Sequence, residues 1–138
     1  LPGGRAAPED ADLAATAARE TREEVGIDVG RHGALLGALD DLAPRSERLP
    51  GIVVSPYVFA VAPGVEATPN HEVQAALWVS VDELADPASA VEYLHELGDG
   101  TTLPFPAFGA RGNVVWGMTH RILSGFLELY ADAVGRGE

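Results

Sequence analysis

Three glutamates, Glu20, Glu23 and Glu24, stand close together at the end of an alanine-rich segment. If this segment is an α-helix, with about 100° of rotation per residue, the three side chains share one face. Like charges three or four positions apart oppose helix formation by about 0.2–0.5 kcal/mol per pair. Arg19 stands four positions before Glu23, which is the weaker order for such a pair, so it offsets only part of the repulsion.

A divalent cation is the partner that this acidic cluster (Glu20, Glu23 and Glu24) lacks. Mg²⁺ binds oxygen ligands, commonly one or two carboxylates together with water and substrate phosphates, and Mn²⁺ accepts the same ligands. Crowding that breaks a local rule is typical of a functional site. The alternative is a solvated acidic helix face, and spacing alone leaves both interpretations open.

The residues around the cluster resemble the Nudix box, G-x5-E-x7-R-E-U-x-E-E-x-G-U, in which U is a bulky apolar residue. The second half of the box matches at Arg19, Glu20, Glu23, Glu24, Gly26 and Ile27, and Thr21 takes a U position. In the first half, Asp10 stands where the box has glutamate, and eight residues instead of seven separate it from Arg19. The extra residue falls in a loop or at the start of the helix, so the second half keeps its register.

The opening L-P-G-G and the segments L-L-G-A-L-D-D-L (35–42) and V-V-W-G-M-T-H-R-I-L (114–123) are similar to the branch that includes coenzyme A pyrophosphatases. The resemblance implies hydrolysis of a nucleoside diphosphate linked to another group, with coenzyme A as the first substrate. ADP-ribose or another dinucleotide is the alternative substrate. A catalytically silent Nudix-like module that binds a nucleotide and regulates a partner is the alternative class, but it has no need of mutually repelling carboxylates.

The resemblance also implies roles for the box residues. Glu20 and Glu24 hold Mg²⁺ or Mn²⁺, and Glu23 binds a second ion or acts on the attacking water. Arg19 orients Glu23 and does not touch the substrate. The cofactor is therefore expected to be Mg²⁺ or Mn²⁺.

Other candidates lie outside the catalytic half of the box. Gly3 and Gly4 let main-chain amides approach a ligand closely, and in the family this loop frames the site. Glu72 is a candidate base or outer-shell group by the same resemblance, and an exposed loop acid is the alternative. Arg45 and Arg48 are candidates to bind phosphate, whose geometry a guanidinium matches; free surface arginines are the alternative.

A helix is expected over about 11–25. Apolar or small residues recur there at helical spacing opposite the glutamates, namely Leu13, Ala14, Ala17, Ala18, Thr21 and Val25. Asp10 or Asp12 can cap the start of this helix, and Gly26 ends it. The stripe then packs on a sheet and holds the acidic face rigidly.

The rest of the chain predicts an α/β sandwich with a mixed β-sheet between helices. Strands are expected over 34–42, 52–62 and 74–81, short helices over 82–84 and 88–97, a stiff segment over 103–108 and a final helix after Gly112 and Asn113. Leu1 and Pro2 look like the end of a buried strand. We therefore expect the chain to be an N-terminally incomplete part of a longer protein.

Composition narrows the function classes. With 138 residues, the chain is expected to form a single Nudix domain, 1–138. A net charge of -12 argues against nonspecific binding to nucleic acid or to anionic membranes. The absence of cysteine excludes disulfides and a thiolate nucleophile, and no apolar run approaches the length of a membrane span. We expect a cytoplasmic enzyme with a small nucleotide-type substrate, and a homodimer is left open.

Overall fold

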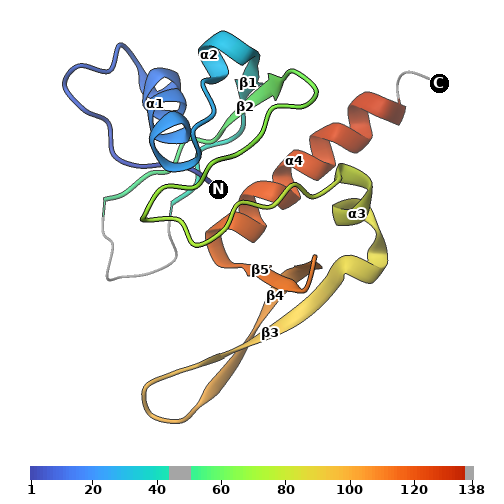
Figure 1. Cartoon of the computed structure of the whole chain (residues 1–138). Coiled ribbons are helices and arrows are strands. Elements are labelled where there is room, and N and C mark those ends of the chain that lie inside the picture. The colour runs from blue at the N-terminus through green and yellow to red at the C-terminus, as the bar shows by residue number, and fades with distance from the viewer. Residues whose placement is uncertain (44–50, 136–138) are drawn as a thin grey trace. The chain divides into compact units, whose positions relative to one another are not determined.

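The computed structural model describes residues 1–43 and 51–135 (Figure 1). The chain divides into two compact units, residues 1–76 and 77–138. Each unit has its own cluster of buried apolar side chains. The expectation of one domain stays a prediction.

The first unit contains two helices and a β-ribbon (Figure 1). Its elements are α1 (Leu13–Val25), α2 (Val29–His32), β1 (Gly33–Ala38) and β2 (Tyr57–Val61). β1 and β2 pair in antiparallel register, from Gly33 opposite Val61 to Ala38 opposite Tyr57. β2 lies within the predicted strand 52–62, β1 begins one residue before the predicted strand 34–42, and both strands are shorter than predicted.

Helix α1 begins and ends at residues that the sequence singles out. Asp12 is the N-cap, and its carboxylate accepts a hydrogen bond of 2.7 Å from the Ala15 amide. Gly26 has a φ of 72°, the left-handed conformation that favours glycine, and its N–H donates to the Arg22 carbonyl at 3.0 Å. The predicted cap and terminator are therefore confirmed.

The buried cluster of the first unit lies at the C-terminal end of α1. It consists of Val25, Ile27 and Val29, and Phe59 and Val61 of β2 pack against it. At the other end of the helix Leu13 is 48% exposed, so the predicted apolar stripe is buried only in part. The core therefore fixes the turn of α1 that carries Glu23 and Glu24.

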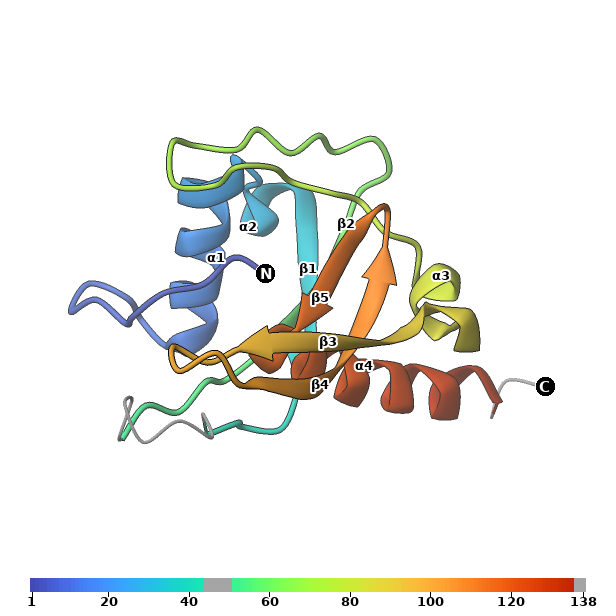
Figure 2. The same ribbon diagram turned by 90° about the horizontal axis from the view of Figure 1, so that it is seen from below.

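The second unit is a three-stranded sheet with helices packed on it. Its elements are α3 (Val81–Ala85), the 3₁₀ turn η1 (Pro87–Ser89), β3 (Ala90–Glu96), β4 (Thr102–Ala110), β5 (Asn113–Trp116) and α4 (Gly117–Gly135). The strand order is β3-β4-β5, and α4 lies against β4 and β5 (Figure 2). Phe108 and Ala110 of β4 are buried against Leu84 of α3 and against Leu123 and Leu127 of α4.

Several predictions for the second half are wrong. Residues 90–96, expected within a helix, form β3, because they pair along their whole length with β4. The segment 103–108, expected only to be stiff, lies in β4, where Pro104 pairs with Leu94 and Pro106 with Glu92; this outcome does not contradict the prediction. The sheet ends in a strand, β5, before the final helix begins.

Two further expectations fail in the described residues. Residues 74–80 form no strand, and no strand includes Leu1 and Pro2, of which Leu1 is 69% exposed.

Every strand pairing among the described elements is antiparallel, and these strands form two sheets. Parallel neighbours need a long crossover connection, and the short connections β3–β4 and β4–β5 favour hairpins instead. The α/β class itself is confirmed.

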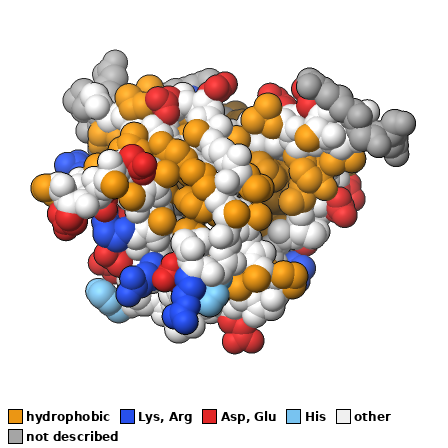
Figure 3. All heavy atoms as spheres, turned by 90° about the horizontal axis from the view of Figure 1, so that it is seen from above, with side chains coloured by type: hydrophobic (Ala, Val, Ile, Leu, Met, Phe, Trp, Pro, Cys, Tyr) orange, Lys and Arg blue, Asp and Glu red, His pale blue; other side chains and the backbone are white. Residues whose placement is uncertain are grey.

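Acidic side chains lie in several separate places on the face shown in Figure 3. The chain carries 21 acidic and 9 basic residues, which gives the net charge of -12. The acidic cluster of α1 therefore accounts for only three of the 21 acidic residues.

Candidate active site

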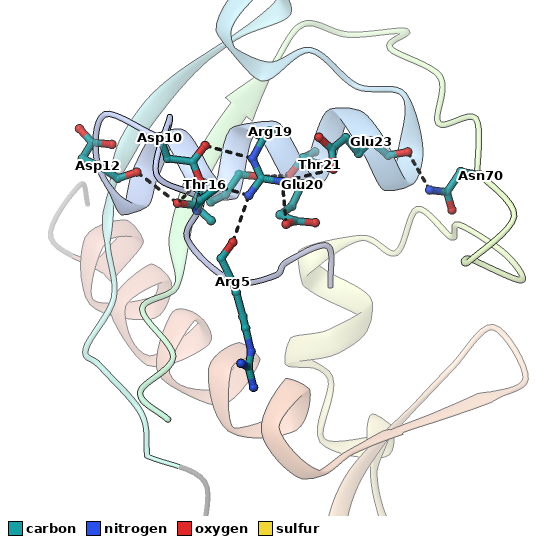
Figure 4. A network of polar contacts seen from close by, with 11 residues as sticks. Arg5, Asp10, Asp12, Thr16, Arg19, Glu20, Thr21, Glu23 and Asn70 are labelled. Atoms are coloured by element: carbon teal, nitrogen blue, oxygen red, sulfur yellow. Dashed lines mark hydrogen bonds and ion pairs between the residues drawn. The ribbon is translucent and has the colours of Figure 1, made fainter. Parts of the chain in front are cut away.

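Arg19 of α1 binds carboxylates on both sides of its guanidinium (Figure 4). Nε and Nη2 donate to the two oxygens of Asp10 at 3.0 and 3.1 Å. Nη1 donates to Glu20 Oε1 at 2.8 Å and to Glu23 Oε2 at 3.2 Å, and Nη2 also donates to the Arg5 carbonyl at 3.1 Å. These bonds use all five guanidinium donors. Arg19 therefore binds both Glu20 and Glu23, and its predicted role of orienting Glu23 in the reaction stays a prediction.

Asp10 is an anchor for this guanidinium and not the cap of α1. Its Oδ2 also accepts hydrogen bonds from the Ala7 amide and from the Thr16 hydroxyl, each at 2.9 Å. The bond from Arg19 and the bond from the Ala7 amide together hold the pKa of Asp10 well below its ordinary 3.8. The same partnership, together with Glu20, raises the pKa of Arg19. The ion pair is therefore charged on both sides at neutral pH.

The members of the acidic cluster differ in their surroundings. The side chain of Glu20 is 16% exposed and that of Glu23 is 57% exposed, and both are bound by Arg19. The Glu24 carboxylate, partly exposed, has no hydrogen bond or ion pair with any residue that the structure describes. Arg19 thus pairs with two of the three glutamates and leaves Glu24 unpaired among the described residues, and the expectation that the nearby cations offset only part of the repulsion stays a prediction.

Gly3 and Gly4 have different surroundings. A Cβ atom built on Gly4 would overlap the carboxyl group of Glu20, whereas a Cβ on Gly3 would meet open space. The main chain at Gly4 therefore covers the Glu20 carboxylate directly. The predicted role of Gly3 and Gly4 in framing a ligand stays a prediction. Of the two glycines, Gly4 is the one that lies against the Glu20 carboxyl group.

The loop 68–72 covers the C-terminal end of α1. The Thr68 amide donates to the Val25 carbonyl at 2.7 Å, and the Asn70 amide donates to the Glu24 carbonyl at 2.8 Å. Nδ2 of Asn70 donates to the Glu23 carbonyl at 2.9 Å (Figure 4). The last carbonyls of a helix have no partner within the helix. Here the loop supplies those partners.

Glu72 belongs to this same loop. Its amide donates to Oδ1 of Asn70 at 2.8 Å, while its carboxylate is 67% exposed and lies 3.8 Å from Nε2 of His71. Glu72, the candidate base, is thus linked to the end of α1 by hydrogen bonds through Asn70. Asn70 was not singled out from the sequence. The signal available was an asparagine two positions before Glu72 in a turn-forming segment, where such side chains commonly accept a local amide.

The donor chemistry of the acidic cluster fits a hard divalent cation. Carboxylate oxygens are the ligands that Mg²⁺ and Mn²⁺ accept, and Glu24 is not engaged by a described residue. Within residues 1–43 and 51–135, no group of three or more Asp, Glu, His or Cys side chains is gathered closely enough to hold a metal ion. The three carboxylates of the acidic cluster are thus not gathered into one ligand set, and at most one or two of them could hold an ion whose shell is completed by water and substrate oxygens.

Arg45 and Arg48, the candidates for phosphate binding, lie outside the described residues. The sites that the structure does describe are therefore the acidic cluster with Arg19, the covering main chain at Gly4, and the loop that carries Glu72.

The model of the NUDIX domain matches residues 1–97. The match includes Asp10, Arg19, the acidic cluster and the loop 68–72. This chain belongs to the Nudix family. No curated protein was found to match it.

Membership settles the general activity. The protein is a Nudix hydrolase that acts on phosphorus-containing anhydrides, and its substrates are small nucleoside diphosphate-linked molecules. Nudix hydrolases generally use divalent metal ions. The described part of this Nudix hydrolase has no helix long and apolar enough to cross a membrane.

Proposed function

We propose that this Nudix hydrolase cleaves the diphosphate of coenzyme A or its derivatives into 3′,5′-ADP and the phosphopantetheine portion. The support for this substrate is the resemblance of the L-P-G-G opening and of segments 35–42 and 114–123 to the coenzyme A pyrophosphatase branch. We also propose the cytoplasm as its location.

The observation that carries the proposed metal-dependent chemistry is the arrangement on α1. Arg19 binds Glu20 and Glu23, and Glu24 is left without a partner among the described residues. Glu20 and Glu24 would hold Mg²⁺ or Mn²⁺, with Glu23 at a second ion or at the attacking water. When bound, such an ion supplies positive charge against the phosphoryl oxygens and lowers the pKa of water.

The chain's own residues do the remaining work. Arg19 keeps Glu20 and Glu23 in fixed orientations, because its guanidinium is itself held by Asp10. Glu72 or Glu23 accepts the proton of the attacking water. The water oxygen forms a new P–O bond at one phosphorus, the bridging P–O bond breaks, and the other phosphate leaves with the bridging oxygen.

A substrate panel tests this proposal. The protein is incubated with Mg²⁺ and coenzyme A, ADP-ribose, NADH, diadenosine polyphosphates or nucleoside triphosphates, and the products are separated, with Glu24→Gln as the inactive control. We expect 3′,5′-ADP to form fastest, from coenzyme A. Preferred cleavage of ADP-ribose or a dinucleotide would replace the substrate assignment. Cleavage of none would indicate the silent nucleotide-binding module.

A further inference from the structure

Asn70 joins the candidate base to the helix that carries the acidic cluster. All four of its polar groups are bonded: its carbonyl accepts from the Val73 amide at 3.3 Å, and the other three contact Glu23, Glu24 and Glu72. Its backbone amide donates to the Glu24 carbonyl at 2.8 Å, its Nδ2 donates to the Glu23 carbonyl at 2.9 Å, and its Oδ1 accepts from the Glu72 amide at 2.8 Å. One side chain therefore connects the backbones of Glu23 and Glu72, residues on separate segments of the chain.

The chemistry of the bonds requires an amide at this position. The partner of Nδ2 is a carbonyl, which only accepts, and the partner of Oδ1 is an N–H, which only donates. Aspartate would keep the second bond and would place an acceptor against the Glu23 carbonyl. Serine or alanine would lose the side-chain bond to the Glu23 carbonyl and keep only the backbone bond to the Glu24 carbonyl. Asparagine alone among short side chains satisfies both partners.

The segment around Asn70 is packed on the core, whereas the Glu72 carboxylate is largely exposed. Val65, Ala67 and Val73 of the same segment pack on the buried cluster Val25, Ile27 and Val29. The segment is thus held on both sides of Asn70. The carboxylate of Glu72 is itself 67% exposed and has only the 3.8 Å contact with His71 among the described residues. Its position therefore depends on the backbone that Asn70 holds.

We propose that Asn70 is a positioning residue of the hydrolase, which fixes the position of Glu72 relative to the last turn of α1. The inference rests on the proposed roles of Glu72 and the acidic cluster. A misplacement of about 1 Å between reacting groups can lower a rate up to about a hundredfold. Loss of the side-chain bonds of Asn70 lets the loop move relative to the cluster and reduces turnover.

The test compares Asn70→Ala and Asn70→Asp with Asn113→Asp as the matched control. Asn113, the first residue of β5, also has an Nδ2 that donates to a backbone carbonyl, that of Arg111 at 3.1 Å, and this carbonyl does not belong to a glutamate. We expect both Asn70 variants to lower kcat about tenfold with a smaller change in KM. We expect the Asn113 variant to match the parent. Asn70→Asp decides the outcome if Asn70→Ala does not fold.

Two further measurements separate positioning from a general structural role. In a double variant, Asn70→Ala with Glu72→Gln, kcat should be no lower than in Glu72→Gln alone, because Asn70 acts through Glu72. Mn²⁺ binding to the protein alone, followed by electron paramagnetic resonance, should match the parent in both Asn70 variants, because the core and not Asn70 fixes the turn of α1 that carries Glu23 and Glu24. Weaker Mn²⁺ binding, parent-like kcat, or a fully multiplicative loss in the double variant would overturn the inference.

Glu20→Gln distinguishes failure of the inference from failure of the proposed function. If Glu20→Gln is as active as the parent, the role of the acidic cluster is wrong and the Asn70 proposal falls with it. If Glu20→Gln is inactive while the Asn70 variants match the parent, only the Asn70 proposal is wrong.

Discussion

Arg19 and Asp10 face each other through two parallel hydrogen bonds, Nε to Oδ1 at 3.0 Å and Nη2 to Oδ2 at 3.1 Å. The same guanidinium binds Glu20 and Glu23 on its other side. Paired bonds of this kind fix the plane of a guanidinium as well as its position. Asp10, on the loop before α1, therefore determines where two members of the acidic cluster lie.

Asp10→Asn should lower both thermal stability and activity. Asparagine keeps the shape of the side chain but removes the charge and presents a donor to Arg19. The released guanidinium no longer fixes Glu20 and Glu23, and we expect kcat to fall about tenfold. Melting temperature and steady-state kinetics measure the two effects.

Asp12→Asn is the matched control for that variant. Asp12 caps α1 through the Ala15 amide, and asparagine caps a helix as well as aspartate does. The control should melt and turn over like the parent. Equal behaviour of the two variants would contradict the role of Asp10.

The Asp10 ion pair also predicts how stability depends on acid. Arg19 and the Ala7 amide hold the pKa of Asp10 below its ordinary 3.8. The stabilisation is complete above that ordinary value and is lost as the pH falls from there through the lowered pKa of the folded state. The difference in melting temperature between the parent and Asp10→Asn should shrink as the pH is lowered below about 4. A difference that stays constant in that range would disprove the assignment.

Gly4→Ala should disturb the acidic cluster, whereas Gly3→Ala should not. A methyl group at Gly4 overlaps the Glu20 carboxyl group, and at Gly3 it meets open space. Since neither glycine has a positive φ, backbone strain does not enter the comparison. We expect Gly4→Ala to lower kcat by about ten- to a hundredfold and to weaken Mn²⁺ binding. Identical kinetics of the two variants would show that Gly4 does not support Glu20.

His120 makes the second unit sensitive to mild acid. Its ring packs against Phe108, with 4.5 Å between ring centroids and 35° between the ring planes, and burial lowers the pKa of the imidazole below its ordinary 6.5. Above that value both states are neutral. Below it the unfolded chain binds a proton more readily, so the folded state loses stability as the pH falls towards the lowered pKa.

His120→Phe keeps a ring at this place and removes the titration. Between about pH 7.5 and about pH 5, the melting temperature of the parent should therefore fall more than that of the variant. The two proteins differ in no other titratable group. The same pH dependence in both would contradict the assignment to His120.

The sequence predicted α1 well because its signals are local. Alanine-rich helical periodicity, Asp12 before the first turn and Gly26 after the last are all read within a few residues. The box pattern also indicated Arg19 and the acidic cluster. Glu24, Glu20 and Glu23 do lie on one short helix, and Arg19 does bind Glu23.

Contacts between distant residues could not be predicted. Asn70 reaches Glu23 across 47 positions, and nothing near Asn70 in the sequence indicates that partner. Residues 90–96 contain apolar side chains that suit either a helix or a strand. They form β3 because β4 lies beside them and pairs with them.

Mn²⁺ binding to the acidic cluster tests the central claim most directly. The parent, Glu24→Gln and Glu9→Gln are titrated with Mn²⁺ at neutral pH, and the free ion is followed by electron paramagnetic resonance. Glu9 is exposed and lies outside the cluster, so its variant controls for the loss of one negative charge. We predict that the parent and Glu9→Gln bind Mn²⁺ alike and that Glu24→Gln binds at least about tenfold more weakly, since a lost carboxylate ligand removes both charge and coordination. Equal binding by all three proteins, or binding by none, would contradict the account.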